Sequence, residues 1–145
     1  MANHLFILGY GYTAGYIVKN LGQDWIKTAT SRSKTSEHCS IIPYDESAIT
    51  KALQTATHLI ISIAPHTNGD TFLCDFADTL KKAEKLKWIG YLSSTSVYGN
   101  HDGKWVDEDT VCSPTSERGR IRLIAENQWL EQGKILKGVL QNIMV

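Results

Sequence analysis

A glycine-rich turn near the start of the chain has the residue types and spacing of a phosphate-binding loop. It reads Gly9-Tyr10-Gly11-Tyr12-Thr13-Ala14, which matches the pattern GxGxxA. In such a turn the first glycine permits a tight bend, the second lets the backbone approach a pyrophosphate, and the small last residue allows close helix packing. The helix that follows would offer its N–H groups and its dipole to the phosphates. We therefore expect a dinucleotide site at residues 9–13, with a tight turn that binds nothing as the alternative.

The residues after the second expected strand distinguish between two nicotinamide cofactors. An NAD site usually carries an acidic residue about 20 positions beyond the first glycine. Here the region reads Thr30-Ser31-Arg32-Ser33-Lys34 and has no acid. Arg32 can form two hydrogen bonds to a 2′-phosphate, and Ser31 and Ser33 can add hydroxyl groups. This pattern favours NADP(H), with NAD(H) as the alternative cofactor and a solvated basic loop as the alternative without a ligand.

Apolar runs that alternate with helical patterns supply the framework for this turn. We expect strands at residues 4–8, 25–30, 41–44, 58–64, 88–92 and 135–145. We expect helices at residues 13–21, 46–56, 70–86 and 116–132, with Gly22 and Gly133 ending the first and the last. The alternation predicts a mostly parallel sheet with helices on both faces, in the strand order 3-2-1-4-5-6. This is a three-layer, doubly wound α/β fold.

A serine-rich segment follows the fifth expected strand and reads Leu92-Ser93-Ser94-Thr95-Ser96-Val97-Tyr98-Gly99. It resembles the SSxxVYG segment of the extended short-chain dehydrogenase/reductases, the NAD-dependent epimerase/dehydratase family. The glycine turn, Asp45 and the loop at 105–110 fit the same family, and the resemblance covers residues 4–136. It implies a Rossmann fold that binds NAD(P)(H). It also implies epimerase, dehydratase or oxidoreductase activity on nucleotide-sugar-like or other hydroxylated substrates.

The resemblance also implies catalytic positions, and two of them hold residues that the family does not use. Family members employ a Ser or Thr, a Tyr that transfers the proton, and a Lys that lowers the pKa of the Tyr. Ser94 falls at the serine position. Aligning Gly119 with the family's YGxxK puts Arg118 at the tyrosine position and Arg122 at the lysine position, on one helical face. Because the pKa of arginine lies above about 12, Arg118 cannot donate a proton near neutral pH.

Three interpretations of residues 116–122 follow. The arginines could bind cofactor and a carboxylated or phosphorylated ligand without hydride transfer. His66 or His101, which follow neighbouring strands, could replace the tyrosine as acid or base. The arginine-rich helix start could also be a solvated surface. The acidic run at 107–109 has no His or Cys at ligand spacing, so we predict no metal site.

The resemblance further implies where the rest of the cofactor lies. Asp45 would lie near the adenine, Ala64 and Pro65 would border the ribose and nicotinamide, and Ser93 would contact the cofactor beside Ser94. Family members continue after the sixth strand into a smaller substrate domain, whereas residues 1–145 would form the cofactor-binding domain alone. We therefore expect a partner chain that supplies a substrate domain, or a homo-oligomer. The alternatives are a non-catalytic binding module and a non-functional fragment of a split or truncated protein.

The composition excludes several other classes of protein. The chain has 145 residues, of which 42% are hydrophobic and 21% charged, values that suit one globular domain and exclude wholesale disorder. Fifteen basic and fifteen acidic residues leave no net charge to attract nucleic acid or an anionic membrane. No apolar stretch approaches the roughly 20 residues of a membrane helix, and the N-terminus has no basic signal-peptide segment. Three widely spaced cysteines without a CxxC pair favour a reducing, cytoplasmic location.

Overall fold

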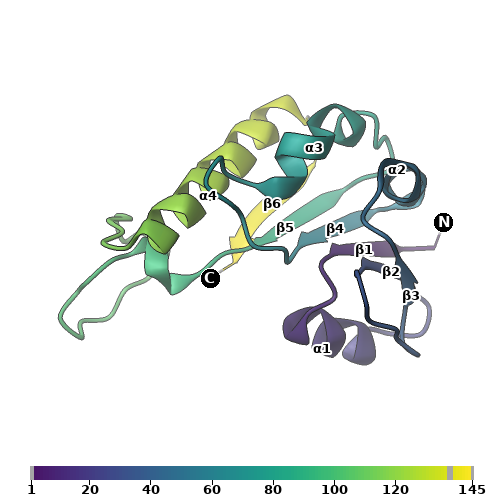
Figure 1. The fold of residues 1–145 in the computed structure, drawn as a ribbon, viewed down its shortest axis with the longest axis horizontal. Helices are drawn as coiled ribbons and strands as arrows, with labels where there is room; N and C mark the ends of the chain where they lie inside the picture. Colours follow the sequence, from purple (N-terminus) through teal and green to yellow (C-terminus); the bar gives the residue numbers. More distant parts are fainter. Residues whose placement is uncertain (1, 137–138, 145) are drawn as a thin grey trace.

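The computed structural model describes residues 2–136 and 139–144. Within these residues, parallel strands form one six-stranded sheet in the order β3-β2-β1-β4-β5-β6 (Figure 1). The strands are β1 (His4–Leu8), β2 (Ile26–Thr30), β3 (Ser40–Ile42), β4 (His58–Ile61), β5 (Trp88–Leu92) and β6 (Leu140–Met144). The strand order and the parallel pairing confirm the expected doubly wound α/β fold.

Helices cover both faces of the sheet, but they cover them unequally. Helix α1 (Tyr12–Asn20) packs on one face, which lies below the sheet in Figure 1. Helices α2 (Glu46–Thr55), α3 (Thr71–Leu80) and α4 (Glu117–Ile135) pack on the other face. A short 3₁₀ helix, η1 (Thr95–Val97), connects the end of β5 to the loop that projects beyond α4.

The central strands are apolar without alternation because both of their faces are covered. All five residues of β1 are buried. Phe6 and Leu8 belong to the cluster under α2, α3 and α4, whereas Leu5 and Ile7 belong to the cluster under α1. A strand that contacts two layers buries the side chains of both its faces, which accounts for the apolar run at residues 5–8. The one polar residue of β1 is His4, and its ring nitrogens lie within hydrogen-bond distance of Thr28 and Thr55.

Helix α3 is shorter than the sequence pattern predicts. It ends at Leu80, whereas we expected it to continue to residue 86. Beyond it the amide of Ala83 bonds the carbonyl oxygen of Leu80, and the amide of Leu86 bonds that of Ala83. These turns keep Ala83 and Leu86 buried at the helical spacing. The apolar pattern therefore continues after the helix has ended, and the lysines at 81, 82 and 85 lie outside it.

Helix α4 is longer than expected, and the sixth strand begins later. The helix runs through Gly133 to Ile135, so the prediction that Gly133 ends it is wrong. Leu136, at the C-cap, packs against the core, and this burial outweighs the modest helix preference lost at a glycine. The expected strand start at 135–136 is therefore wrong, and β6 spans Leu140–Met144. Residues 137, 138 and 145 of the expected strand lie outside the described residues.

Smaller differences affect two other elements. Helix α1 is followed by Leu21 rather than Gly22 at its C-cap. Strand β4 ends at Ile61, so Ala64 and Pro65 lie in the loop that follows it. The carboxyl ends of the strands, where the expected site residues lie, are unaffected.

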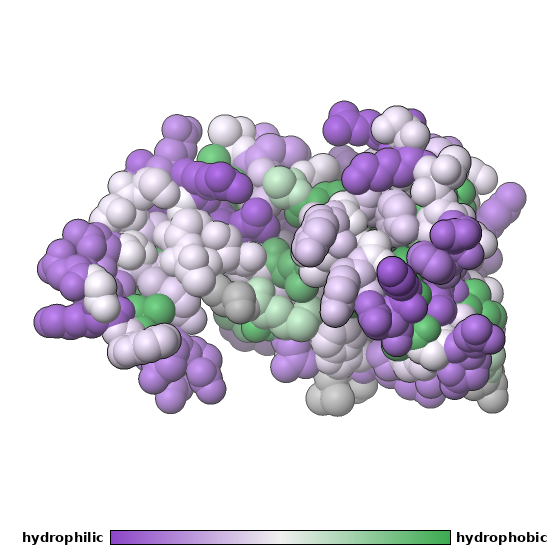
Figure 2. Space-filling model, turned by 90° about the horizontal axis from the view of Figure 1, so that it is seen from below, coloured by the Kyte–Doolittle hydropathy of each residue, from purple (hydrophilic) through white to green (hydrophobic). Residues whose placement is uncertain are grey.

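The face that carries α1 is left partly uncovered beside β5 and β6. The register places Trp88 and Leu92 of β5 on the same face as Met144, and Trp88 and Leu92 are only half-buried. Figure 2 shows apolar side chains gathered in a hollow of this face beside α1. We call Trp88, Leu92 and Met144 the lower-face patch. None of the helices in the described ranges combines the length and the apolar character that crossing a bilayer requires.

Candidate dinucleotide and substrate site

The parallel sheet brings the predicted site residues to one edge. Gly9 follows β1, Ser31 follows β2, Asp45 follows β3, Ala64 follows β4 and Ser93 follows β5. The carboxyl ends of parallel strands share an edge, and ligands of open α/β sheets bind there. The start of α4 joins this edge because Gly119 lies against η1. A Cβ at Gly119 would lie 2.9 Å from Cβ of Pro114 and even closer to the carbonyl oxygen of Ser96.

The glycine turn has the backbone geometry that its sequence predicts. Gly9 has φ +98°, and a Cβ there would lie 2.8 Å from Cγ2 of Ile63, so both conformation and space require glycine. The amide of Gly9 donates to Oγ1 of Thr30 over 2.8 Å. The amide of Tyr10 donates to the carbonyl oxygen of Thr30 over 2.8 Å. Sequence reasoning missed Thr30, although its place at the end of the adjacent strand could have indicated the contact.

The N-terminus of α1 is not capped by a side chain of the described residues. Asp45, Asp70 and Ser116 cap α2, α3 and α4, whereas the N-cap of α1 is Gly11. The first hydrogen bond of this helix runs from the amide of Gly15 to the carbonyl oxygen of Gly11, so the preceding amides have no partner within the helix. A Cβ at Gly11 would meet nothing within 4 Å. The turn therefore presents backbone donors, including those of Tyr12 and Thr13, beside open space.

The loop after β2 lies beside the glycine turn. The hydroxyl of Tyr10 donates to Oγ of Ser36 over 2.8 Å and ties the two segments together. Oγ of Ser31 accepts from the amide of Lys34 over 3.0 Å and shapes the loop. Arg32 and Ser33 are exposed at its tip. The side chains expected to contact a 2′-phosphate are therefore accessible next to the uncapped helix.

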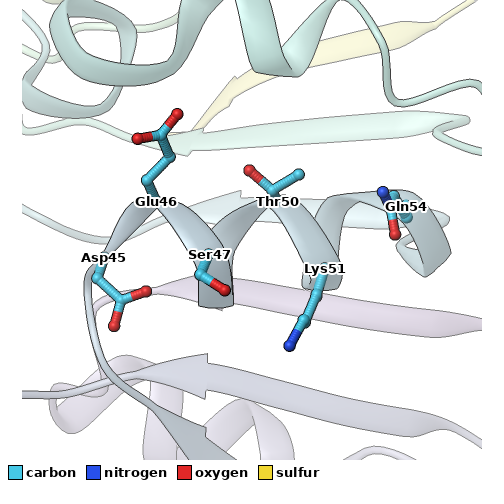
Figure 3. Close-up of a pocket in the computed structure, with 6 residues that line it drawn as sticks. All are labelled: Asp45, Glu46, Ser47, Thr50, Lys51 and Gln54. Carbon is cyan, nitrogen blue, oxygen red and sulfur yellow. The ribbon is translucent and has the colours of Figure 1, made fainter.

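Asp45 has a structural task that the sequence analysis did not predict. Its carboxylate accepts from the amide of Ala48 over 2.8 Å and caps α2. Asp45 also lines a shallow depression along α2, in which Glu46 and Lys51 point in different directions (Figure 3). A depression whose polar groups diverge along one exposed helix has no common centre for a ligand.

The serine segment places its two hydroxyls in different surroundings. Ser94 caps η1, and its Oγ accepts from the hydroxyl of Ser96 over 3.1 Å. Oγ of Ser93 instead donates to the carboxylate of Glu126, which lies on α4 and is buried. Burial raises the pKa of Glu126, against the opposing effects of the Ser93 hydrogen bond and the Arg122 charge. Sequence reasoning missed Glu126, although its position four residues after Arg122 puts both on one helical face.

Four predicted site residues line a single cavity at this edge. Its volume is about 250 Å³, and its walls are formed by Ala64, Pro65, Glu117, Arg118, Ile121 and Arg122. The guanidinium of Arg122 donates to the hydroxyl of Tyr91 over 3.2 Å and to the carbonyl oxygen of Leu92 over 3.1 Å. Arg118 is exposed at the cavity wall. The structure thus brings the loop after β4 together with Arg118 and Arg122 of α4.

A second buried acid lies near Arg122. Asp70 is fully buried, and its Oδ1 accepts from the amide of Leu73 over 2.9 Å. Burial raises the pKa of Asp70, and the Leu73 hydrogen bond and the Arg122 charge oppose that shift. Sequence reasoning did not single out Asp70. Arg122 therefore lies near two buried carboxyl groups, those of Asp70 and Glu126, whose pKa values are raised by burial.

Neither of the two histidines considered as alternative acids or bases lines the cavity, although His66 directly follows Pro65. His66 is exposed, and its backbone pairs with that of Gly69. Nε2 of His101 lies 2.9 Å from the carbonyl oxygen of Tyr98. Tyr91 is the phenol beside Arg122, but it is buried, and its pKa is raised to about 12. Across the described ranges, no group of three or more His, Cys, Asp or Glu could hold a metal ion.

The sheet order, the glycine turn and the converging strand ends define a Rossmann-like α/β domain. No known protein-family profile matches the sequence, and no curated protein matches it either. Among solved structures, the chain is similar to a conserved protein of unknown function from Silicibacter pomeroyi DSS, with 35% identity and a TM-score of 0.82. That match covers 97% of this chain and 52% of the other.

Two sugar-nucleotide epimerases are also structural neighbours. UDP-glucuronic acid 4-epimerase from Bacillus cereus, solved with NAD, has 18% identity and a TM-score of 0.74 over 97% of this chain and 55% of its own. UDP-glucose 4-epimerase from Brucella ovis, also solved with NAD, has 17% identity and a TM-score of 0.75 over 98% and 51%. These neighbours confirm the expected likeness of fold to NAD-dependent epimerases. The chain spans about half the length of each.

Proposed function

We propose that this chain binds a nicotinamide dinucleotide along the carboxyl edge of its sheet. The observation that carries the proposal is the uncapped N-terminus of α1 beside the open space at Gly11. The N–H groups and dipole of a helix start stabilise phosphate charge. The pyrophosphate would lie on the turn formed by residues 9–13, and Ala64 and Pro65 would border the nicotinamide end. The epimerase neighbours solved with NAD support this reading.

Calorimetric titration of two glycine variants tests the proposal. Gly11→Val fills the open space where a pyrophosphate would approach, in an extended conformation that any residue adopts. Gly15→Ala is the matched control, because its Cβ would meet only the Tyr10 ring at 3.8 Å. We expect the wild-type chain and Gly15→Ala to bind NADPH, and Gly11→Val to bind at least tenfold more weakly with an unchanged melting temperature. Equal affinities of all three chains for NADPH would contradict a pyrophosphate site at this turn.

We propose NADP(H) as the preferred cofactor, since Arg32 and Ser33 are accessible beside the turn and residues 30–34 contain no acid. Ser31 would add its hydroxyl hydrogen. Arg32→Ala should weaken NADPH binding by about 1.5–3 kcal/mol, the value of a charge-assisted hydrogen bond, and leave NADH binding nearly unchanged. Equal weakening of the two cofactors would contradict the 2′-phosphate contact and leave NAD(H) as the cofactor.

Our proposal for the reactive end is a binding module rather than a catalyst of the epimerase type. The cavity wall carries Arg118 in place of a phenol, and the nearby Tyr91 holds its proton far above neutral pH. The catalytic alternative rests on Ser94, whose hydroxyl would orient a substrate oxygen. Detectable hydride transfer to a hydroxylated or carbonyl substrate, abolished by Ser94→Ala, would favour that alternative.

We further propose that a second polypeptide completes the protein, either as a partner with a substrate domain or as another copy of this chain. The half-covered sheet face supports this, because parallel sheets are generally buried on both sides. The three cysteines are unpaired. A cytoplasmic setting remains a prediction from the sequence.

A further inference from the structure

The cavity at the start of α4 has a composition that the dinucleotide does not explain. Its lining includes three apolar residues, Ala64, Pro65 and Ile121, and two arginines, Arg118 and Arg122. One carboxylate, that of Glu117, also lines it. The lining therefore carries a net charge of one positive unit next to a small apolar surface.

The two arginines differ in how their charge is balanced. Arg122 is half-buried and fixed by Tyr91 and Leu92, and its charge opposes the rise in pKa that burial causes at Asp70 and Glu126. Arg118 is exposed and forms no ion pair with any residue of the described ranges. The guanidinium of Arg118 thus keeps its hydrogen-bond donors available to a ligand in the cavity.

We propose that this cavity binds the anionic group, a carboxylate or a phosphate, of a second ligand that lies beside the nicotinamide end of the dinucleotide. The inference rests on the proposed function, since it takes the same edge of the sheet as the cofactor site. A guanidinium matches either anion through two parallel hydrogen bonds. Arg118 is the recognition residue, and Arg122 adds positive charge from a fixed position.

The size of the cavity limits what enters it. Its volume of about 250 Å³ lies below the range of roughly 300–1,000 Å³ that holds whole drug-sized ligands. The anionic group and a few attached atoms fit, while the rest of the ligand would remain outside. The ligand class is therefore a small acid, or a larger molecule that presents a terminal carboxylate or phosphate.

A pair of variants on the same helix provides the test. Arg118→Gln and Arg120→Gln each remove one exposed positive charge from the first turns of α4, but only Arg118 lines the cavity. Amide chemical shifts are followed by NMR during titration with glucuronate, inorganic phosphate and neutral glucose at constant ionic strength, with and without NADPH. We expect glucuronate or phosphate to shift the signals of Ala64 and Ile121, and glucose to leave them unchanged. The Kd should rise at least tenfold in Arg118→Gln and less than twofold in Arg120→Gln.

The same spectra separate this inference from the cofactor proposal. Phosphate bound at the glycine turn would shift Tyr12 and Thr13, and Gly11→Val should abolish that effect while leaving the shifts at Ala64 and Ile121. The cavity proposal is overturned if Ala64 and Ile121 do not respond, if both arginine variants weaken binding equally, or if glucose acts like glucuronate. Loss of the Tyr12 and Thr13 response alone would count against the cofactor site and not against the cavity. The anion with the lower Kd shows whether the cavity prefers a carboxylate or a phosphate group.

Discussion

Side chains near the strand ends form contacts that the resemblance did not indicate, and Ser93 and Glu126 illustrate this. The resemblance pointed to Ser94, whose hydroxyl faces the turn of η1. Its neighbour Ser93 donates to a buried carboxylate one helix away. This contact joins the segment after β5 to α4. A buried carboxyl group at such a joint also makes the stability of the fold depend on pH.

The raised pKa of Glu126 fixes the direction of that dependence. A carboxyl that holds its proton more tightly when folded stabilises the fold below its ordinary pKa of 4.5, and loses that stabilisation as pH rises through the raised value. The contribution of Glu126 to the free energy of unfolding should therefore fall between pH 5 and pH 8, whereas His4 and His58, whose pKa values are lowered by burial, contribute in the opposite direction. Glu126→Gln should reduce this fall, because its amide oxygen still accepts from Ser93 and carries no charge. Urea unfolding at both pH values measures it.

Glu131→Gln is the matched control for this experiment, since Glu131 lies on the same helix but is exposed and pairs only with Lys134. Its pH profile should match that of the wild-type chain. Asp70, whose pKa is also raised by burial, contributes in the same direction, so some pH dependence remains in Glu126→Gln. Identical profiles for the wild-type chain and Glu126→Gln would show that Glu126 does not hold its proton.

At the scale of the elements, the sequence predicted the type and order of the helices and strands well, and predicted their first and last residues less well. The five buried residues of β1 and the glycine turn predict a strand followed by a helix, because burial on both faces leaves a continuous apolar run. The end of α3 could not be predicted, because the turns after Leu80 keep Ala83 and Leu86 buried as a helix would. Glu126 and Thr30 were missed because their partners are distant in sequence.

The contact between α4 and η1 yields a prediction at this scale. Gly119 lies so close to Ser96 and Pro114 that a Cβ would force the helix start away from η1. Gly119→Ala should destabilise the fold by about 1–3 kcal/mol, as overpacked positions do. Gly15→Ala makes the same substitution inside α1, where space exists, and should stabilise by about 0.5–1 kcal/mol. Thermal unfolding of both variants measures the contrast, and two changes of the same sign would contradict it.

The whole molecule is asymmetric, with three helices on one face of the sheet and α1 on the other. The lower-face patch is the result. Strand β6 pairs only with β5 among the described strands, so its outer backbone groups form an open edge next to this patch. An open edge and an adjacent apolar face both favour association with another chain.

Self-association should therefore increase with concentration when the chain is studied alone. Leu92→Asn places an amide on the lower-face patch and should shift the sedimentation profile toward the monomer. Val111→Asn changes an exposed apolar residue on the projecting loop and should have no such effect. If the wild-type chain stays monomeric at all concentrations, the lower-face patch does not drive self-association.

The uncapped start of α1 has a consequence for how long the folded chain survives. A bound pyrophosphate would accept hydrogen bonds from the start of α1 and so serve as the cap that Gly11 cannot provide. The fold would gain this stabilisation when the dinucleotide binds and lose it when the dinucleotide dissociates. Ligand that binds only the native state adds RT ln(1 + [L]/Kd) to its stability, about 2.7 kcal/mol at a hundredfold excess over Kd. Protease resistance would then follow the supply of nucleotide around the chain. A cell depleted of that nucleotide would clear the chain faster than one that is replete.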